Sequence, residues 1–403
     1  MASRWVCSVL WILFYLGPAY FMVLPVRAAE YVITPSVTLR ETYDDNVYFR
    51  DVDDFEHLIS PALELDGRTD LARVQTACAW DISKYPRHDE LDSVDQRYRL
   101  SGTVSPNPLL QLNISGRYAY DYTFVSTLEE SGLVAERSRR TSATVQPGAT
   151  FILDPRNTLE FSYEFNKTRY DFERYPDYVV HGLNLTWFHA LRNERTRIIC
   201  LLGGNWADFD QNDGEVRQRT CRALAGIDHQ WRETLQVTLT AGAHYTESKF
   251  PKTELVFVPP ASFTSTTTNL EEDDRGFIVD GTLNWRLEPI TLSASVNRDV
   301  VPSIYGENIT RDRVRAALTY RMSDNIRCTL ATAYYRNETE GFVQEEKWQT
   351  YSARPTITYQ FTEDINLQLG YAYTWTENRI TDRSEDRNRI FLQLATAWSD
   401  TID

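Results

Sequence analysis

The sequence predicts a transmembrane antiparallel β-barrel of about 18 strands, and three observations support this fold class. Stretches of strand length alternate between apolar and polar residues, short polar breaks separate these stretches, and the chain opens with an export signal. A barrel of this kind hides its apolar residues in alternation rather than in long runs. The mean hydropathy of -0.44 is therefore compatible with a membrane protein.

The clearest alternation runs from Leu110 to Tyr122. One face is apolar and aromatic: Leu110, Leu112, Ile114, Gly116, Tyr118, Tyr120 and Tyr122. The other is mostly polar: Gln111, Asn113, Ser115, Arg117, Ala119 and Asp121. A period of two residues indicates a β-strand, and the tyrosines gather at one end, as expected at a membrane interface. The same pattern recurs in residues 159–166, 235–243, 290–297 and 365–373.

Short polar breaks divide the chain into hairpin-sized pieces. They are 66–69, 105–108, 154–157, 192–195, 231–233, 288–289, 323–325 and 362–364. Longer, more acidic segments lie between them, so we expect short turns at one end of the barrel and long loops at the other.

The N-terminus resembles a secretory signal. Arg4 precedes an apolar run from Trp5 to Leu24, and Val26 and Ala28 suit cleavage after Ala28. The alternative is a retained membrane anchor. We favour residues 1–28 as a signal peptide and 29–403 as one barrel domain, which predicts a location in the bacterial outer membrane.

The formal net charge of -15 argues against nucleic acid as a partner, because such proteins carry basic patches. Acidic residues gather in segments expected to be loops, namely 44–54, 208–215 and 271–274. They could bind divalent cations that bridge lipopolysaccharide. Simple solvation of exposed loops is the favoured interpretation.

The mature chain contains Cys78, Cys200, Cys221 and Cys328. A disulfide between Cys200 and Cys221 across one hairpin is one interpretation, given an oxidising periplasm. We favour two free thiols facing lipid, because disulfide geometry between adjacent strands is demanding.

Charged residues also occur on the face predicted to line the lumen. The candidates are Arg99, Arg117, Glu160, Glu164, Arg222, Asp228, Asp280, Arg286, Arg315, Arg321 and Arg354. Opposing charges across a lumen could sort solutes, as charged rings do in pores. They could equally neutralise one another and stabilise the wall, and the sequence leaves both interpretations open.

The longest irregular stretch runs from Phe250 to Asp274 and includes Phe257, Pro259 and Pro260. Loops of this length are often functional. We favour a loop that folds inward to narrow the pore over one that projects outward as a hairpin or packs on a neighbour.

No motif indicates catalysis, a cofactor or a metal. The six histidines show no spacing that pairs them with a nucleophile. The segment from Asp208 to Glu215 departs from a calcium loop, because Gly214 occupies the seventh position instead of the sixth. We expect a protein that is not an enzyme.

Two segments near the start resemble a known family. Tyr43-Asp44-Asp45-Asn46 follows the first predicted strand, and Ser60-Pro61 lies in the returning strand. This pair is similar to the opening of the outer-membrane β-barrel porins (beta-barrel porin 2-like) associated with exopolysaccharide and capsule gene clusters. The resemblance implies an outer-membrane barrel, with polysaccharide export as an association. A tight acidic turn would also explain residues 43–46.

These observations predict a polar pore, linked to exopolysaccharide export or saccharide diffusion. The alternative is a non-conducting scaffold whose acidic loops hold surface polysaccharide or a partner protein. Expected partners are outer-membrane lipid and lipopolysaccharide, the barrel-insertion machinery, polysaccharide and export-complex proteins.

Overall fold

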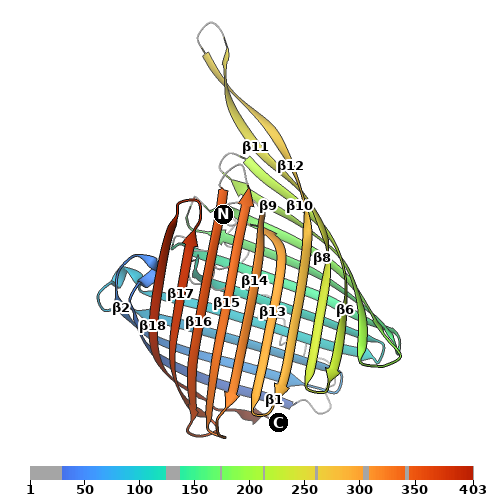
Figure 1. Ribbon diagram of the computed structural model, residues 1–403, viewed down its shortest axis with the longest axis vertical. Coiled ribbons are helices and arrows are strands. Elements are labelled where there is room, and N and C mark those ends of the chain that lie inside the picture. The colour runs from blue at the N-terminus through green and yellow to red at the C-terminus, as the bar shows by residue number, and fades with distance from the viewer. Residues whose placement is uncertain are drawn as a thin grey trace.

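The computed structural model describes residues 30–123, 137–172, 175–211, 214–258, 262–302, 308–340 and 345–402. Its strands form one closed antiparallel barrel (Figure 1). The first nine strands are β1 (Glu30–Asp44), β2 (Asp54–Arg68), β3 (Ala72–Lys84), β4 (Ser93–Asn107), β5 (Leu110–Tyr122), β6 (Arg139–Asp154), β7 (Asn157–Tyr170), β8 (Asp177–Ala190) and β9 (Thr196–Gln211). The others are β10 (Gly214–Arg232), β11 (Leu235–Val258), β12 (Ser262–Leu287), β13 (Ile290–Pro302), β14 (Asn308–Arg321), β15 (Ile326–Glu340), β16 (Glu345–Gln360), β17 (Ile365–Asn378), β18 (Arg383–Ala397) and the short β19 (Asp400–Ile402).

Each strand pairs with its neighbours in sequence, and β1 closes the barrel by pairing with both β2 and β18. The closing register joins Ser36 to Ala397 and Asp44 to Arg389, while β19 pairs with residues 31–33 of β1. The predicted fold class and the strand number of about 18 are therefore confirmed. The predicted breaks fall at or beside the turns that follow the even-numbered strands from β2 to β16.

The two faces of the wall differ as the alternation predicts. Along most strands the large apolar residues exposed on the outside share one phase, as Leu112 and Ile114 do on β5 and Leu392 and Leu394 do on β18. The residues between them are polar, as Asn113 and Gln393 are. An apolar outer band around a polar interior is the arrangement of barrels that cross outer membranes.

No helix among the residues listed above is long and apolar enough to cross a membrane. Two short 3-10 turns within the described residues contribute to the site described below. The first, η1 (Val47–Phe49), lies between β1 and β2, and the second, η2 (Asp89–Leu91), lies between β3 and β4.

The expectation of an infolded loop at 250–274 is wrong. Residues 250–258 of β11 pair in register with residues 262–270 of β12, and the two strands continue past the rim as a two-stranded ribbon (Figure 1). Phe257 lies in β11, whereas Pro259 and Pro260 lie outside the described residues. Backbone hydrogen bonds to the partner strand hold this segment extended, so it projects away from the lumen.

Several acidic residues expected in loops lie in strands instead. Asp208 and Asp210 lie in β9, residues 271–274 lie in β12, and Asp44 and Asp54 are buried strand ends. Solvation of loops therefore does not explain all of these carboxylates, because strand pairing and ion pairs fix several of them.

The four cysteines of the barrel are free thiols. Cys200 pairs with Ala225 and Cys221 pairs with Gly204, so the two are offset by four residues across the β9–β10 ladder. This offset places them too far apart along the strands for the cross-strand disulfide considered above.

Candidate functional site

The candidate functional site is the lumen and the rim at its loop end. All eleven predicted lumen charges lie in the inward phase of their strands, opposite the exposed apolar residues: Arg99, Arg117, Glu160, Glu164, Arg222, Asp228, Asp280, Arg286, Arg315, Arg321 and Arg354. Their local partners differ, so the wall does not act as one uniform charged ring.

Asp228 on β10 is fully engaged by its neighbours. Its carboxylate accepts hydrogen bonds from Arg197 Nε at 2.9 Å, Gln236 Nε2 at 2.9 Å and Thr238 Oγ1 at 3.1 Å. Asp280 accepts one from Asn297 Nδ2 at 3.2 Å. At Asp228 the contact with Arg197 supports neutralisation within the wall, whereas the amide of Asn297 satisfies a hydrogen bond of Asp280 without cancelling its charge.

Arg222 reaches across one strand. Its Nη2 donates to Asn184 Oδ1 at 2.8 Å, over Gly203 of the intervening strand β9. A Cβ atom at Gly203 would lie 2.5 Å from Asn184 Oδ1 and 2.9 Å from Arg222 Nε. Glycine is required here because the bridge occupies the space of a side chain.

Two hollows line the inner wall. The larger, about 500 Å³, lies along β12 to β17 and includes Arg315 and Arg354. The smaller, about 290 Å³, lies along β5 to β8 and includes Glu160. The structure thus brings two predicted basic residues to one hollow and a predicted acid to the other, while the remaining predicted charges line neither.

At the loop end, the β1–β2 connection folds inward and forms a site that sequence reasoning missed. Val47, Tyr48 and Phe49 of η1 are buried and pack with Tyr85 and Leu91 of the β3–β4 connection. We call these five residues the rim cluster. Because Tyr48 and Phe49 lie under the guanidinium of Arg387, an inward-facing side chain of β18, the cluster occupies the inner side of the mouth.

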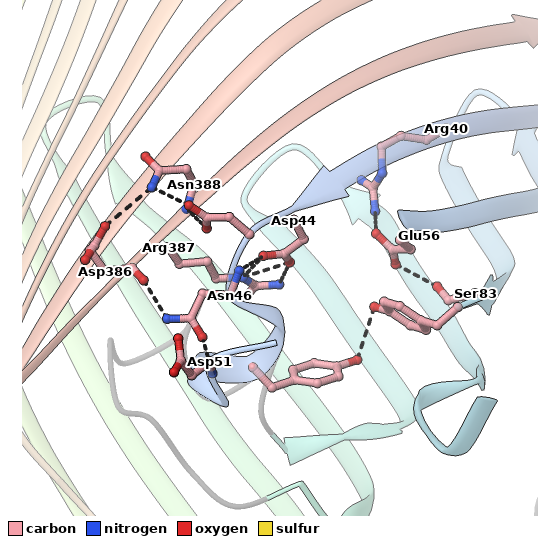
Figure 2. A network of polar contacts seen from close by, with 12 residues as sticks. Arg40, Asp44, Asn46, Asp51, Glu56, Ser83, Asp386, Arg387 and Asn388 are labelled. Carbon is pink, nitrogen blue, oxygen red and sulfur yellow. Dashed lines mark hydrogen bonds and ion pairs between the residues drawn. The ribbon is translucent and has the colours of Figure 1, made fainter. Parts of the chain in front are cut away.

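An ion pair anchors this cluster. Arg387 Nε on β18 donates to Asp44 Oδ2 at 2.9 Å (Figure 2). The Arg387 guanidinium also lies over the rings of Tyr48 and Phe49, at 5.9 and 6.0 Å from their centroids. Arg137 lies over Tyr48 at 5.7 Å and over Tyr122 at 3.5 Å. A cation–π contact contributes more where the charged group is shielded from water, as it is at this buried site.

The η1 backbone is strained. Tyr48, Phe49 and Asp51 have φ values of 56°, 54° and 57°, in the left-handed region that few bulky residues adopt. Asn46 holds this turn: its Nδ2 donates to the Asp386 carbonyl at 2.7 Å, and its Oδ1 accepts from the Asp51 N–H at 2.8 Å (Figure 2). Strained residues persist where the surroundings over-determine them, and they cluster at functional sites.

The β3–β4 connection completes the rim. The hydroxyls of Tyr85 and Tyr48 lie 3.4 Å apart, and burial raises the pKa of Tyr85, which keeps this hydroxyl protonated. The Arg137 guanidinium donates to the carbonyls of Glu90, Leu91 and Asp92. Three separate connections therefore meet over one side of the mouth.

Within the described ranges, no group of three or more His, Cys, Asp or Glu side chains could hold a metal ion. Residues 212 and 213 of the calcium-like segment fall outside those ranges, and Asp208 and Asp210 lie on β9.

Comparisons with known proteins found one family match and several structural similarities. A family model described as a protein of unknown function (DUF2490) matches residues 315–402, which run from β14 to β19. No curated protein matches the chain.

Several solved outer-membrane barrels are similar in shape. The ferric-catecholate import receptor Fiu from E. coli K12 has a TM-score of 0.48 at 8% identity, with 90% of this chain and 81% of that chain covered. OpdK from Pseudomonas aeruginosa has a TM-score of 0.46 at 10% identity, covering 93% and 100%. OccAB3 from Acinetobacter baumannii has a TM-score of 0.44 at 9% identity, covering 92% and 99%. The likeness is one of barrel architecture, so functional argument depends on this chain's own geometry.

Proposed function

We propose that the chain is an outer-membrane pore through which small polar solutes diffuse. The observation that carries this proposal is the closed wall of strands β1 to β18 with its polar inner face and two hollows of about 500 and 290 Å³. A barrel of 16 to 18 strands encloses an aqueous channel unless something fills it. A role other than catalysis is part of the same proposal.

The route to the membrane is also a proposal. The N-terminal apolar run with Val26 and Ala28 supports export and cleavage after Ala28. The exposed apolar band supports contact with lipid and lipopolysaccharide, and insertion by the barrel-insertion machinery.

Saccharide or exopolysaccharide as the solute is the finer part of the proposal. It is supported only by the resemblance at Tyr43–Asn46 and Ser60-Pro61. Asp44 holds Arg387, Asn46 holds η1, and Ser60 Oγ donates to Asp81 Oδ1 at 2.5 Å. These contacts give Asp44 and Asn46 a role in building the rim and Ser60 a role in the wall between β2 and β3. Polysaccharide and export-complex proteins as partners belong to this finer part of the proposal.

The rim cluster favours a second candidate. Its five side chains are at most 7% exposed and close part of the mouth. If they close all of it, the barrel is a non-conducting scaffold that displays the β11–β12 ribbon and its other loops to surface polysaccharide or a protein partner.

Single-channel recording of the refolded protein in a planar bilayer separates the two. Stable conductance of the wild type supports the pore. Silence of the wild type together with current in a Tyr48→Ala/Phe49→Ala variant identifies a pore that the rim closes. Silence of both rejects the pore and favours the scaffold.

A further inference from the structure

The larger hollow is built around two arginines on one side of the lumen. In register, Arg315 on β14 lies beside Ser295 on β13 and Ala333 on β15. Arg354 on β16 lies beside Ala331 on β15. Between and around these arginines the lining is small or hydroxylated: Thr282, Ser293, Ala317, Ser352, Ala372 and Thr374. The short side chains create the concavity, and the guanidinium groups border it.

The two arginines differ in their side-chain partners. Arg315 is oriented by a neutral group, since its Nε and Nη2 donate to Tyr335 Oη at 3.1 and 2.7 Å. A phenol fixes the guanidinium without cancelling its charge. Arg354 is exposed to the lumen and has no hydrogen bond or ion pair to any side chain in the described ranges.

The acidic residues described on β14 and β15 point to the outer face of the wall. Asp312 on β14 points outward and pairs with Arg298 at 3.0 Å, and Glu338 on β15 points outward and pairs with Arg336 at 2.7 Å. The nearest inward acids lie on β12 and β13: Asp280 accepts a hydrogen bond from Asn297, and Asp299 interacts with Arg311 and Arg313, nearer the rim. In a chain of net charge -15, this strip of inward arginines is a local feature, not a consequence of composition.

We propose that this hollow binds a small organic anion through its carboxylate or phosphate group, which takes a bidentate pair of hydrogen bonds from Arg354 and the charge of Arg315. Guanidinium groups match the geometry of both oxyanions. The volume of about 500 Å³ suits a solute of one or two sugar rings, and the serine and threonine hydroxyls would orient its polar groups. The inference deepens the proposed pore function by naming the class of solute.

Binding is tested apart from conduction, with ligand-observed NMR on the refolded protein in detergent. The probes are D-glucuronate, D-glucose 6-phosphate and D-glucose, which share a ring and differ in charge. We expect the wild type to bind at least one anion and not glucose. Binding of glucuronate alone identifies a carboxylate site, and binding of the phosphate alone identifies a phosphate site.

The variants Arg354→Gln and Arg315→Gln should each weaken the dissociation constant about tenfold or more, because a charge-assisted pair is lost. The matched control is Arg327→Gln, an inward and exposed arginine on β15 that lies outside the hollow. Its dissociation constant should stay within about twofold of wild type, as expected for distant and independent sites. Retained heat-modifiable mobility on gels confirms that each variant folds.

Absence of anion binding, equal binding of glucose, or equal effects of Arg354→Gln and Arg327→Gln would overturn the site. Bilayer recordings of the same samples test the pore separately. Anion binding by a silent barrel would reject conduction and leave the site standing, whereas conduction without anion binding would reject the site alone.

Discussion

Arg387 on β18 and Asp44 on β1 form a buried ion pair across the seam that closes the barrel, although 343 residues separate them in the chain. The same guanidinium lies over Tyr48 and Phe49, so a single side chain ties the last strand to the first and to η1. This contact therefore couples the seam of the barrel to the rim cluster.

Replacing one partner of this pair should destabilise the barrel. Arg387→Gln leaves the Asp44 carboxylate buried without a cation, a change that typically costs about 3 to 5 kcal/mol. The measurement is the urea midpoint of unfolding, followed by the heat-modifiable mobility of the refolded protein. A lower midpoint is the expected result.

Arg383→Gln is the matched control on the same strand. Arg383 pairs with Glu385 at 2.7 Å, but its side chain is 75% exposed, and such pairs contribute less than about 1 kcal/mol. Equal midpoints for the two variants would show that the seam pair adds nothing beyond a surface pair.

Opening the rim should raise conductance. The Tyr48→Ala/Phe49→Ala variant removes two rings from the inner side of the mouth while leaving Asp44 and Arg387 in place. We expect a larger single-channel conductance than in the wild type, because the rings occupy part of the cross-section.

Tyr43→Ala provides the comparison for that experiment. Tyr43 belongs to the same segment but points outward, with its ring 5.2 Å from that of Phe55. It should leave conductance unchanged. A double variant with wild-type conductance would mean that the rim cluster lies aside from the path of ions.

Shortening the β11–β12 ribbon should not change conductance. Replacing residues 254–266 by an Asn-Gly turn keeps the Thr253–Thr267 pair in register and suits a two-residue hairpin. The ribbon projects away from the lumen (Figure 1), so we expect wild-type currents in bilayers. An increase in current would show that the ribbon folds over the mouth in the membrane.

The wall could be predicted from sequence because its information is local. Alternation such as that around Ile114 fixes which residues face lipid, and polar breaks such as Ser323–Asn325 fix the turns. The inward phase of Arg315 and Arg354 follows from the same period. Their shared hollow could not be predicted, because it depends on the register of β14 against β15 and β16.

The rim and the ribbon show where local information ends. The acidic residues at 44–46 indicate a turn, but their partners are Arg387 and Asn388 on the last long strand. The sequence carries one signal for each of these features. Val47, Tyr48 and Phe49 are apolar residues inside an acidic loop, and threonines 264 and 266–268 favour strand over infolded loop.

The β3–β4 connection should respond to acid through Asp92. Its carboxylate accepts hydrogen bonds from Lys84 Nζ at 2.5 Å and from the Tyr85 N–H at 2.9 Å. The hydrogen bond from Lys84, followed by that from the Tyr85 N–H, holds the pKa of Asp92 below its usual value. A carboxyl with a depressed folded-state pKa stabilises the protein above its unfolded-state pKa of about 3.9. That contribution is lost as the pH falls through the lower folded-state pKa.

The difference in urea midpoint between wild type and Asp92→Asn should therefore be constant from neutral pH to about pH 5 and should shrink below about pH 4. Glu90→Gln changes an exposed carboxyl of the same connection and controls for loss of a loop charge. If the difference in urea midpoint persists at low pH, the effect of Asp92 comes from hydrogen bonds that its protonated form also makes and not from its negative charge. If the difference in urea midpoint between Glu90→Gln and wild type stays constant across the same pH range, the acid response comes from the hydrogen bonds that Asp92 accepts from Lys84 and Tyr85.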